Sequence, residues 1–86
     1  MPGNRDRHDQ IRDILFVAES DIASTAIQYA VGLTNKQARN LLEILVNAQC
    51  LQATGRPVHY LITALGRELR ERLDWIEELL NTAPGR

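Results

Sequence analysis

The stretch from Thr34 to Leu51 constrains the fold of this chain more than any other part of it. Its apolar residues recur every three or four positions, as they do on one face of an amphipathic helix. They are Ala38, Leu41, Leu42 and Leu45. The opposite face is polar, and Asn, Lys and Arg outnumber Glu on it: Asn35, Lys36, Arg39, Asn40, Glu43 and Asn47. The sequence therefore predicts a helix that packs on a core with one face and offers hydrogen-bonding groups with the other.

The polar residues crowd the first turns of this predicted helix, and their chemistry suits nucleic acid. Arg and Asn side chains carry paired hydrogen-bonding groups that match the major-groove edges of guanine and adenine. The start of a helix also has free N–H groups and partial positive charge, which suit phosphate. We therefore expect double-stranded DNA as a partner, contacted by Asn35, Lys36, Gln37, Arg39 and Asn40.

An apolar helix is predicted at the start of the chain, after a loose end over residues 1–4. Asn4 or Asp6 can cap it, and we expect it to end near Glu19 or Ser20. Its apolar residues follow the helical template: Ile11, Ile14, Leu15 and Ala18.

Residues 20–25 are expected to form a turn that leads into a second, shorter helix. Thr25 with Gln28 fits a capping box, in which each side chain bonds the other residue's backbone, and Ser24 is the other candidate cap. Gly32 is placed to end this helix in a left-handed conformation.

The junction with the next helix repeats these signals. We expect Leu33 to be buried in the turn, and Thr34 with Gln37 fits a second capping box. A short helix, a turn with glycine and a longer helix with polar first turns together form a helix-turn-helix pattern.

A β-hairpin is predicted directly after this pattern. Residues 51–54 and 58–62 read as strands around the turn Gly55-Arg56-Pro57. Val58, Tyr60 and Ile62 would share the inner face, with His59 pointing outward. A hairpin in this place makes the pattern a winged helix, and it puts Arg56 at the wing tip, where it can contact phosphate or the minor groove.

A long last helix is predicted from the cap Thr63 to about Asn81, with a tail over residues 82–86. We expect Leu65 and Leu69 to close the domain's own core. Further along, the apolar stripe has the four- and three-residue spacing of a coiled coil, which predicts a homodimer. The expected interface residues are Leu69, Leu73, Trp75, Ile76, Leu79 and Leu80.

The charge of the chain is divided unevenly along its 86 residues, which is the length of one domain. The net charge is −1, and both ends are acidic. Residues 22–67, in contrast, carry four basic residues against Glu43 alone. A locally basic surface of this kind favours DNA contact, although it predicts few phosphate contacts.

Other classes of function find little support. The single cysteine, Cys50, excludes an intramolecular disulfide and fits a reducing, intracellular setting. With DNA as the expected partner, we expect the protein to be cytoplasmic and associated with the nucleoid. We expect no membrane segment, because no apolar run approaches the ~20 residues that a span needs. His8 and His59 lack zinc-ligand spacing, and no motif points to a catalytic site, a cofactor or a small-molecule ligand.

Three short motifs resemble those of a small archaeal winged-helix family that includes dimeric chromatin-associated proteins. They are Thr25, Ile27 and Tyr29; Leu33 and Thr34; and Tyr60, Ile62, Thr63 and Gly66. The resemblance covers residues 8–80. It implies a winged helix whose C-terminal helices pair as an antiparallel coiled coil in a homodimer.

Three functions remain open on the sequence alone. The chromatin-type members are basic with a longer last helix, and this slightly acidic chain departs from both features. A transcriptional regulator that prefers certain DNA sequences is therefore favoured over a protein that coats DNA without regard to sequence. The third possibility is a winged helix used only for protein–protein assembly, which the acidic balance favours and the Asn-, Lys- and Arg-rich helix start disfavours.

Overall fold

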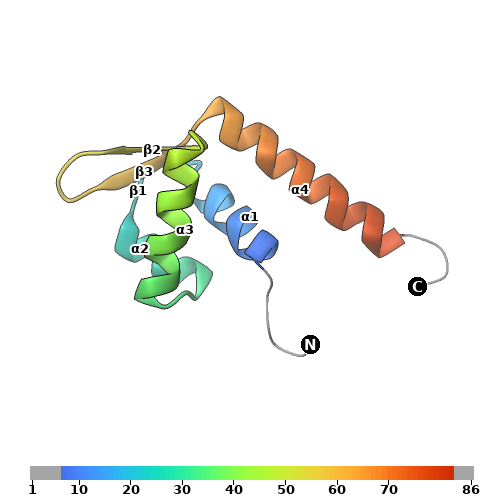
Figure 1. Cartoon of the computed structure of the whole chain (residues 1–86), viewed down its shortest axis with the longest axis horizontal. Helices are drawn as coiled ribbons and strands as arrows, with labels where there is room; N and C mark the ends of the chain where they lie inside the picture. The colour runs from blue at the N-terminus through green and yellow to red at the C-terminus, as the bar shows by residue number, and fades with distance from the viewer. Residues whose placement is uncertain (1–6, 83–86) are drawn as a thin grey trace.

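Helices α1, α2 and α3 pack around one apolar core, while a small sheet and the long helix α4 flank them (Figure 1). The computed structural model describes residues 7–82. The elements within them are α1 (Arg7–Val17), β1 (Ile22–Ala23), α2 (Ser24–Val31), α3 (Asn35–Asn47), β2 (Leu51–Thr54), β3 (His59–Ile62) and α4 (Ala64–Thr82). The expected fold class, mainly α with a small β-hairpin and a long C-terminal helix, is confirmed. The predicted caps Asn4 and Asp6, the loose start and the tail beyond Thr82 lie outside the described residues.

The core takes side chains from all three of the first helices and from the hairpin. Its members include Ile14, Leu15, Ile27, Val31, Leu41, Leu42, Leu45, Leu51 and Ile62. All four apolar residues predicted for the inner face of α3 are buried. A fully buried side chain of this size contributes roughly 1.5–3 kcal/mol, so the stripe fixes which face of α3 is left for solvent.

The turn between α2 and α3 has the conformation that the sequence predicts. Gly32 has φ +76°, and the N–H groups of Gly32 and Leu33 both donate to the carbonyl oxygen of Gln28 at 3.0 Å. A positive φ is open to glycine at no steric cost. Leu33 in the same turn is buried, as the sequence predicts.

The two predicted capping boxes have different outcomes. Thr34 and Gln37 form theirs at the start of α3. The box predicted for Thr25 and Gln28 is wrong, because α2 begins at Ser24 and Ala23 occupies the cap position with extended backbone. Helix α1 likewise ends at Val17, slightly before the predicted end.

The sheet has three strands in the order β1-β3-β2, all antiparallel. Residues 20–25 were expected to be only a turn, but Ile22 pairs with Tyr60 across β1 and β3. A strand of two residues is too short to show the alternation by which strands are recognised in a sequence. This pairing ties the beginning of α2 to the hairpin.

Helix α4 leaves the hairpin through a close contact with the end of α3. The Thr63 hydroxyl accepts a hydrogen bond from the Gly66 N–H at 3.0 Å, which confirms the predicted cap. A Cβ atom on Gly66 would lie 2.2 Å from the carbonyl oxygen of Cys50. Glycine at this position therefore lets α4 pass directly over the α3–β2 junction.

Ion pairs hold the charged side of α4 against α1. Arg12 pairs with Asp74 at 3.5 Å and with Glu77. Glu19, just beyond α1, accepts hydrogen bonds from Arg70 and, at 3.4 Å, from Arg67. The Arg70 hydrogen bond is the main reason that the pKa of Glu19 is lowered.

Candidate nucleic-acid interface

The polar side of α3 and the hairpin turn form one exposed surface, which we call the α3–wing face. It consists of Asn35, Lys36, Arg39, Asn40, Glu43, Asn47 and Arg56, all of them exposed. Burial of the opposite stripe in the core forces these side chains outward. Arg56 lies in the turn between β2 and β3, and the hairpin projects from the body of the molecule away from α4 (Figure 1).

Gln37 has a structural role at the start of α3. Its side-chain oxygen accepts from the Thr34 N–H at 3.0 Å, and its own N–H donates to the Thr34 hydroxyl at 3.1 Å. The side-chain NH₂ of Gln37 is left to donate elsewhere. The expected contact of Gln37 with DNA stays a prediction. It could be made only through this NH₂ group.

Asn35 and Arg39 are linked in a short exposed chain of hydrogen bonds. Arg39 donates to the side-chain oxygen of Asn35 at 3.4 Å, and Asn35 donates to Gln28 of α2 at 3.5 Å. Both bonds are long, and long bonds at an exposed site are weak. They orient the two side chains while leaving them free to exchange these partners for a ligand.

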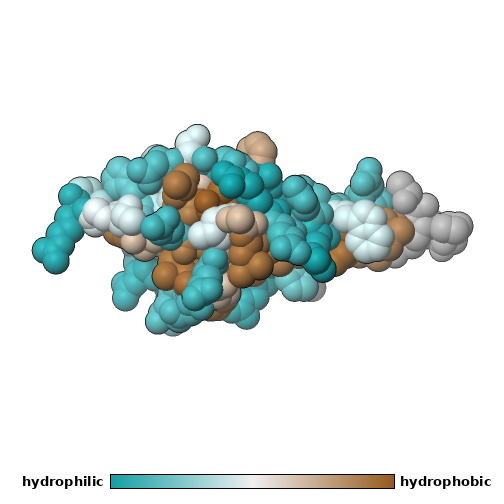
Figure 2. Space-filling model, turned by 90° about the horizontal axis from the view of Figure 1, so that it is seen from above, coloured by the Kyte–Doolittle hydropathy of each residue, from teal (hydrophilic) through white to brown (hydrophobic). Residues whose placement is uncertain are grey.

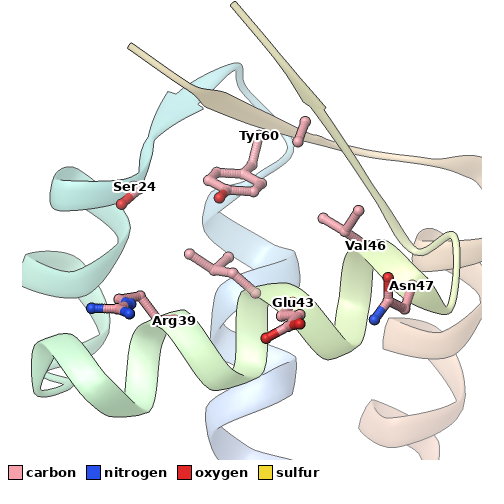
Figure 3. A pocket seen from close by; sticks show the side chains of 8 residues that line it. Ser24, Arg39, Glu43, Val46, Asn47 and Tyr60 are labelled. Carbon is pink, nitrogen blue, oxygen red and sulfur yellow. The ribbon is translucent and has the colours of Figure 1, made fainter. Parts of the chain in front are cut away.

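A hollow of about 280 Å³ separates α3 from the sheet (Figure 3). Its lining residues are Ser24, Arg39, Leu42, Glu43, Val46, Asn47, Ala53 and Tyr60. Arg39, Glu43 and Asn47 follow one another along α3 at one side of it. Tyr60 and Ser24 face them from β3 and from the start of α2. The hollow thus has an apolar floor and a rim of hydrogen-bonding groups.

A second hollow of about 300 Å³ lies between α1 and α3, and it is lined by Arg7, Gln10, Gln37, Asn40 and Leu41. Arg7 and Gln10 therefore extend the polar surface of α3 toward the start of α1. Sequence reasoning missed both residues, as it missed Ser24 and Tyr60 beside the other hollow. No sequence signal marks them, because only the packing of α1, α2 and β3 around α3 brings them there.

The cations of the α3–wing face differ from the arginines that face α1 or lie along α4. Within the described part of the chain, Lys36, Arg39 and Arg56 form no ion pair. The other group is paired internally with carboxylates: Arg12, Arg67, Arg70 and Arg72. The positive charge of the α3–wing face is thus left uncompensated and available to an anionic partner.

A second exposed surface runs along α4, which we call the α4 flank. Trp75, Ile76, Leu79 and Leu80 are exposed there by 62%, 46%, 51% and 52%. Leu69 packs against the core and Leu73 is half-buried, but Leu65 is 49% exposed, so its expected place in the core is wrong. Leu65 lies outward beside Ala48 because α4 passes over the end of α3 at Gly66. Figure 2 shows apolar side chains near both ends of α4.

The fold and this surface define a class of protein. A helix-turn-helix whose second helix presents its polar side, followed directly by a β-hairpin, is a winged helix. Residues 4–81 match the family model described as winged helix-turn-helix. The chain therefore belongs to the winged helix-turn-helix family.

A solved structure shows the same fold. It is the crystal structure of Sso10a-2, a DNA-binding protein from Sulfolobus solfataricus, with a TM-score of 0.84 and 24% sequence identity. The match covers 90% of this chain and 83% of that one. Together with the family match it confirms the resemblance to small archaeal winged-helix proteins. A comparison with curated proteins gave no match.

Metal ions and membranes would need other kinds of site. Among residues 7–82, no three His, Cys, Asp or Glu side chains lie close enough together to hold a metal ion. In the same part of the chain, no helix combines the length and the apolar character needed to cross a membrane. Burial raises the pKa of the Cys50 thiol, which disfavours the reactive thiolate form.

Proposed function

We propose that this protein is a transcriptional regulator that binds double-stranded DNA at preferred sequences. In this proposal α3 enters the major groove and the wing contacts the backbone or the minor groove of the same duplex. One observation carries it: the exposed side of α3 offers Asn and Arg side chains together with cations that form no ion pair among the described residues. These groups match both base edges and phosphates. The protein would act where the DNA is, at the nucleoid in the cytoplasm.

The proposal includes a homodimer formed through the α4 flank. Charged side chains of α4 already pair with Arg12 of α1 and with Glu19, whereas Trp75, Ile76 and Leu80 of the flank are exposed by 46–62%. Exposed apolar surface along a projecting helix favours association. Twofold pairing of two α4 helices in opposite directions would set the start of one flank against the end of the other. It would also present two copies of α3 to two half-sites.

A titration of binding against salt concentration tests the DNA role. Fluorescence anisotropy with random duplex and with sites selected from a randomised library measures both affinities at each salt concentration. A regulator should bind its selected site at least ~10³-fold more tightly than random duplex. Both affinities should fall as salt rises, because phosphate contacts release counterions.

The other outcomes correspond to the other functions. Equal affinity for all duplexes would identify a protein that coats DNA, and the sequence-preferring role would be wrong. Absence of binding at low salt by a folded dimer would leave protein–protein assembly as the function.

A further inference from the structure

One acidic side chain interrupts the α3–wing face. Glu43 is the single carboxylate in residues 22–67, the segment that contains α2, α3 and the whole hairpin. It lies in the middle of α3, one turn after Arg39 and one turn before Asn47, at the rim of the hollow (Figure 3). Any duplex that lies along α3 would therefore have to accommodate this charge.

Glu43 also differs from several carboxylates elsewhere on the surface, although Glu71 of α4 likewise has no partner among the described residues. Glu19, Glu68 and Asp74 each pair with an arginine. Glu43 makes no hydrogen bond or ion pair among the described residues, although Arg39 is four positions before it, the spacing at which helical pairs form. Arg39 instead donates to Asn35. The carboxylate is thus left without a partner beside groups suited to DNA.

An unpaired carboxylate in that position acts in two opposite ways. It repels phosphates, so it weakens every arrangement in which the backbone lies close to the middle of α3. It also accepts hydrogen bonds, and among the major-groove edges the N4 amine of cytosine is the donor that Glu matches. Specificity grows when unfavourable contacts penalise wrong partners and a favourable contact offsets them in the right one.

We propose that Glu43 is a specificity-determining residue, which reads the N4 amine of one cytosine and penalises DNA that lacks it there. This inference rests on the proposed function, since it requires α3 to enter the major groove. Arg39 and Asn47 on either side of Glu43 keep the duplex close, and the carboxylate then selects the position along the sequence. Sequence preference in this protein would arise from an acidic residue as well as from the basic ones.

A double-mutant cycle between the carboxylate and the amine tests the inference. Wild type and Glu43→Ala are each titrated with the selected site and with copies in which one cytosine at a time is replaced by 2-pyrimidinone, which lacks the amine. At one position wild type should lose about tenfold in affinity while Glu43→Ala loses less than about twofold. Glu43→Ala should also bind random duplex about two- to threefold more tightly, because one repulsive charge is gone.

Glu71→Ala is the matched control, because it removes the same charge from an exposed helical position of α4. It should change neither the affinity for random duplex nor the effect of the missing amine, and circular dichroism verifies that both variants are folded. Equal behaviour of the two variants, or loss of the amine costing both proteins the same at every position, overturns the inference. Wild type that binds duplex without any preferred site overturns it too, while leaving DNA binding in place. Wild type that binds no duplex overturns the proposed function along with it.

Discussion

The α3–wing face and the contact between α4 and α1 both carry charged side chains, but they use them differently. On the contact between α4 and α1, arginines and carboxylates satisfy one another within the chain. On the α3–wing face, Lys36, Arg39 and Arg56 form no ion pair with any carboxylate in residues 7–82. Internal pairing ties a charge to the fold, whereas an unpaired surface charge is available to a partner.

Helix α4 shows the same contrast with apolar groups. Its charged side chains pair with Arg12 and Glu19, whereas Trp75, Ile76 and Leu80 stay exposed, although Ile76 and Leu80 line a hollow that they share with α1. Substitutions on different surfaces should therefore change different quantities: the free energy of unfolding, the affinity for DNA or the association of two chains. A side chain that is satisfied internally should affect unfolding, and one that is left open should affect binding.

The largest effect is expected from Ile76→Asp on the α4 flank. In a twofold dimer each substitution is present twice, so loss of two buried isoleucines should cost roughly 3–6 kcal/mol of association free energy. The variant should be monomeric, keep its helix content and bind a two-half-site DNA far more weakly. Sedimentation equilibrium measures the association, and circular dichroism the helix content.

Glu71→Ala, on α4 but outside the apolar flank, serves as the control and should stay dimeric. If wild type is already monomeric at tens of micromolar, well above the concentration at which stable dimers associate, the dimer proposal is wrong. The contrast within α4 would then rest only on the ion pairs of its charged side chains.

Much of this fold could be predicted from the sequence because its signals are local. The period of the apolar stripe placed α3 and its buried face, and Gly32 with Thr34 and Gln37 placed the turn before it. Strand β1 could not be predicted, because two residues have no period and Ile22 is a strand only through its pairing with β3. The same pairing explains why the cap predicted at Thr25 is wrong.

The residues of the candidate site also fall into those that could be predicted from the sequence and those that could not. Asn35, Lys36, Arg39 and Asn40 could be predicted to lie on one exposed side because a single helix carries them. Arg7 could not, since it comes to the edge of α3 only when α1 packs against the core. The misplaced Leu65 has a similar cause, because helical spacing gives the stripe but cannot say where α4 crosses α3.

Substitutions at the start of α3 should give the next largest effect. Arg39→Ala and Asn40→Ala should each cost about 1–3 kcal/mol of binding free energy at the preferred site, the range for a paired contact to a base. Neither should lower the free energy of unfolding, since both side chains point away from the core. Anisotropy titrations and urea unfolding measure the two quantities.

Arg70→Ala should lower the free energy of unfolding and leave DNA binding unchanged, because Arg70 is paired with Glu19 and lies on α4. Unchanged DNA affinity in both α3 variants would contradict the assignment of α3 as the recognition helix.

Arg56→Ala should have a smaller effect, of about 1 kcal/mol, as expected for a phosphate contact at an exposed wing. Binding should weaken equally on selected and random duplex, and the slope of log affinity against log salt should fall by about one. A loss confined to one base pair would show instead that Arg56 reads bases or groove width. Uniform weakening distinguishes the wing from α3, where the loss should depend on sequence.

The smallest effect concerns Glu19 and appears only as a dependence on pH. The arginines around Glu19 lower its pKa in the folded protein, Arg70 most of all, so folding favours the carboxylate. Its contribution to stability is therefore present above the ordinary pKa of a glutamate and is lost as the pH falls through the lowered value. Glu19→Gln should accordingly unfold more easily than wild type at neutral pH, and the difference should vanish in acid. Urea unfolding across this pH range measures it, with Glu71→Gln as a control that should show no such difference.

DNA affinity at neutral pH should be the same in Glu19→Gln and wild type, because this ion pair lies between α1 and α4. A loss of affinity there would mean that the contact between α4 and α1 also sets the position of α3, and that the two surfaces are coupled.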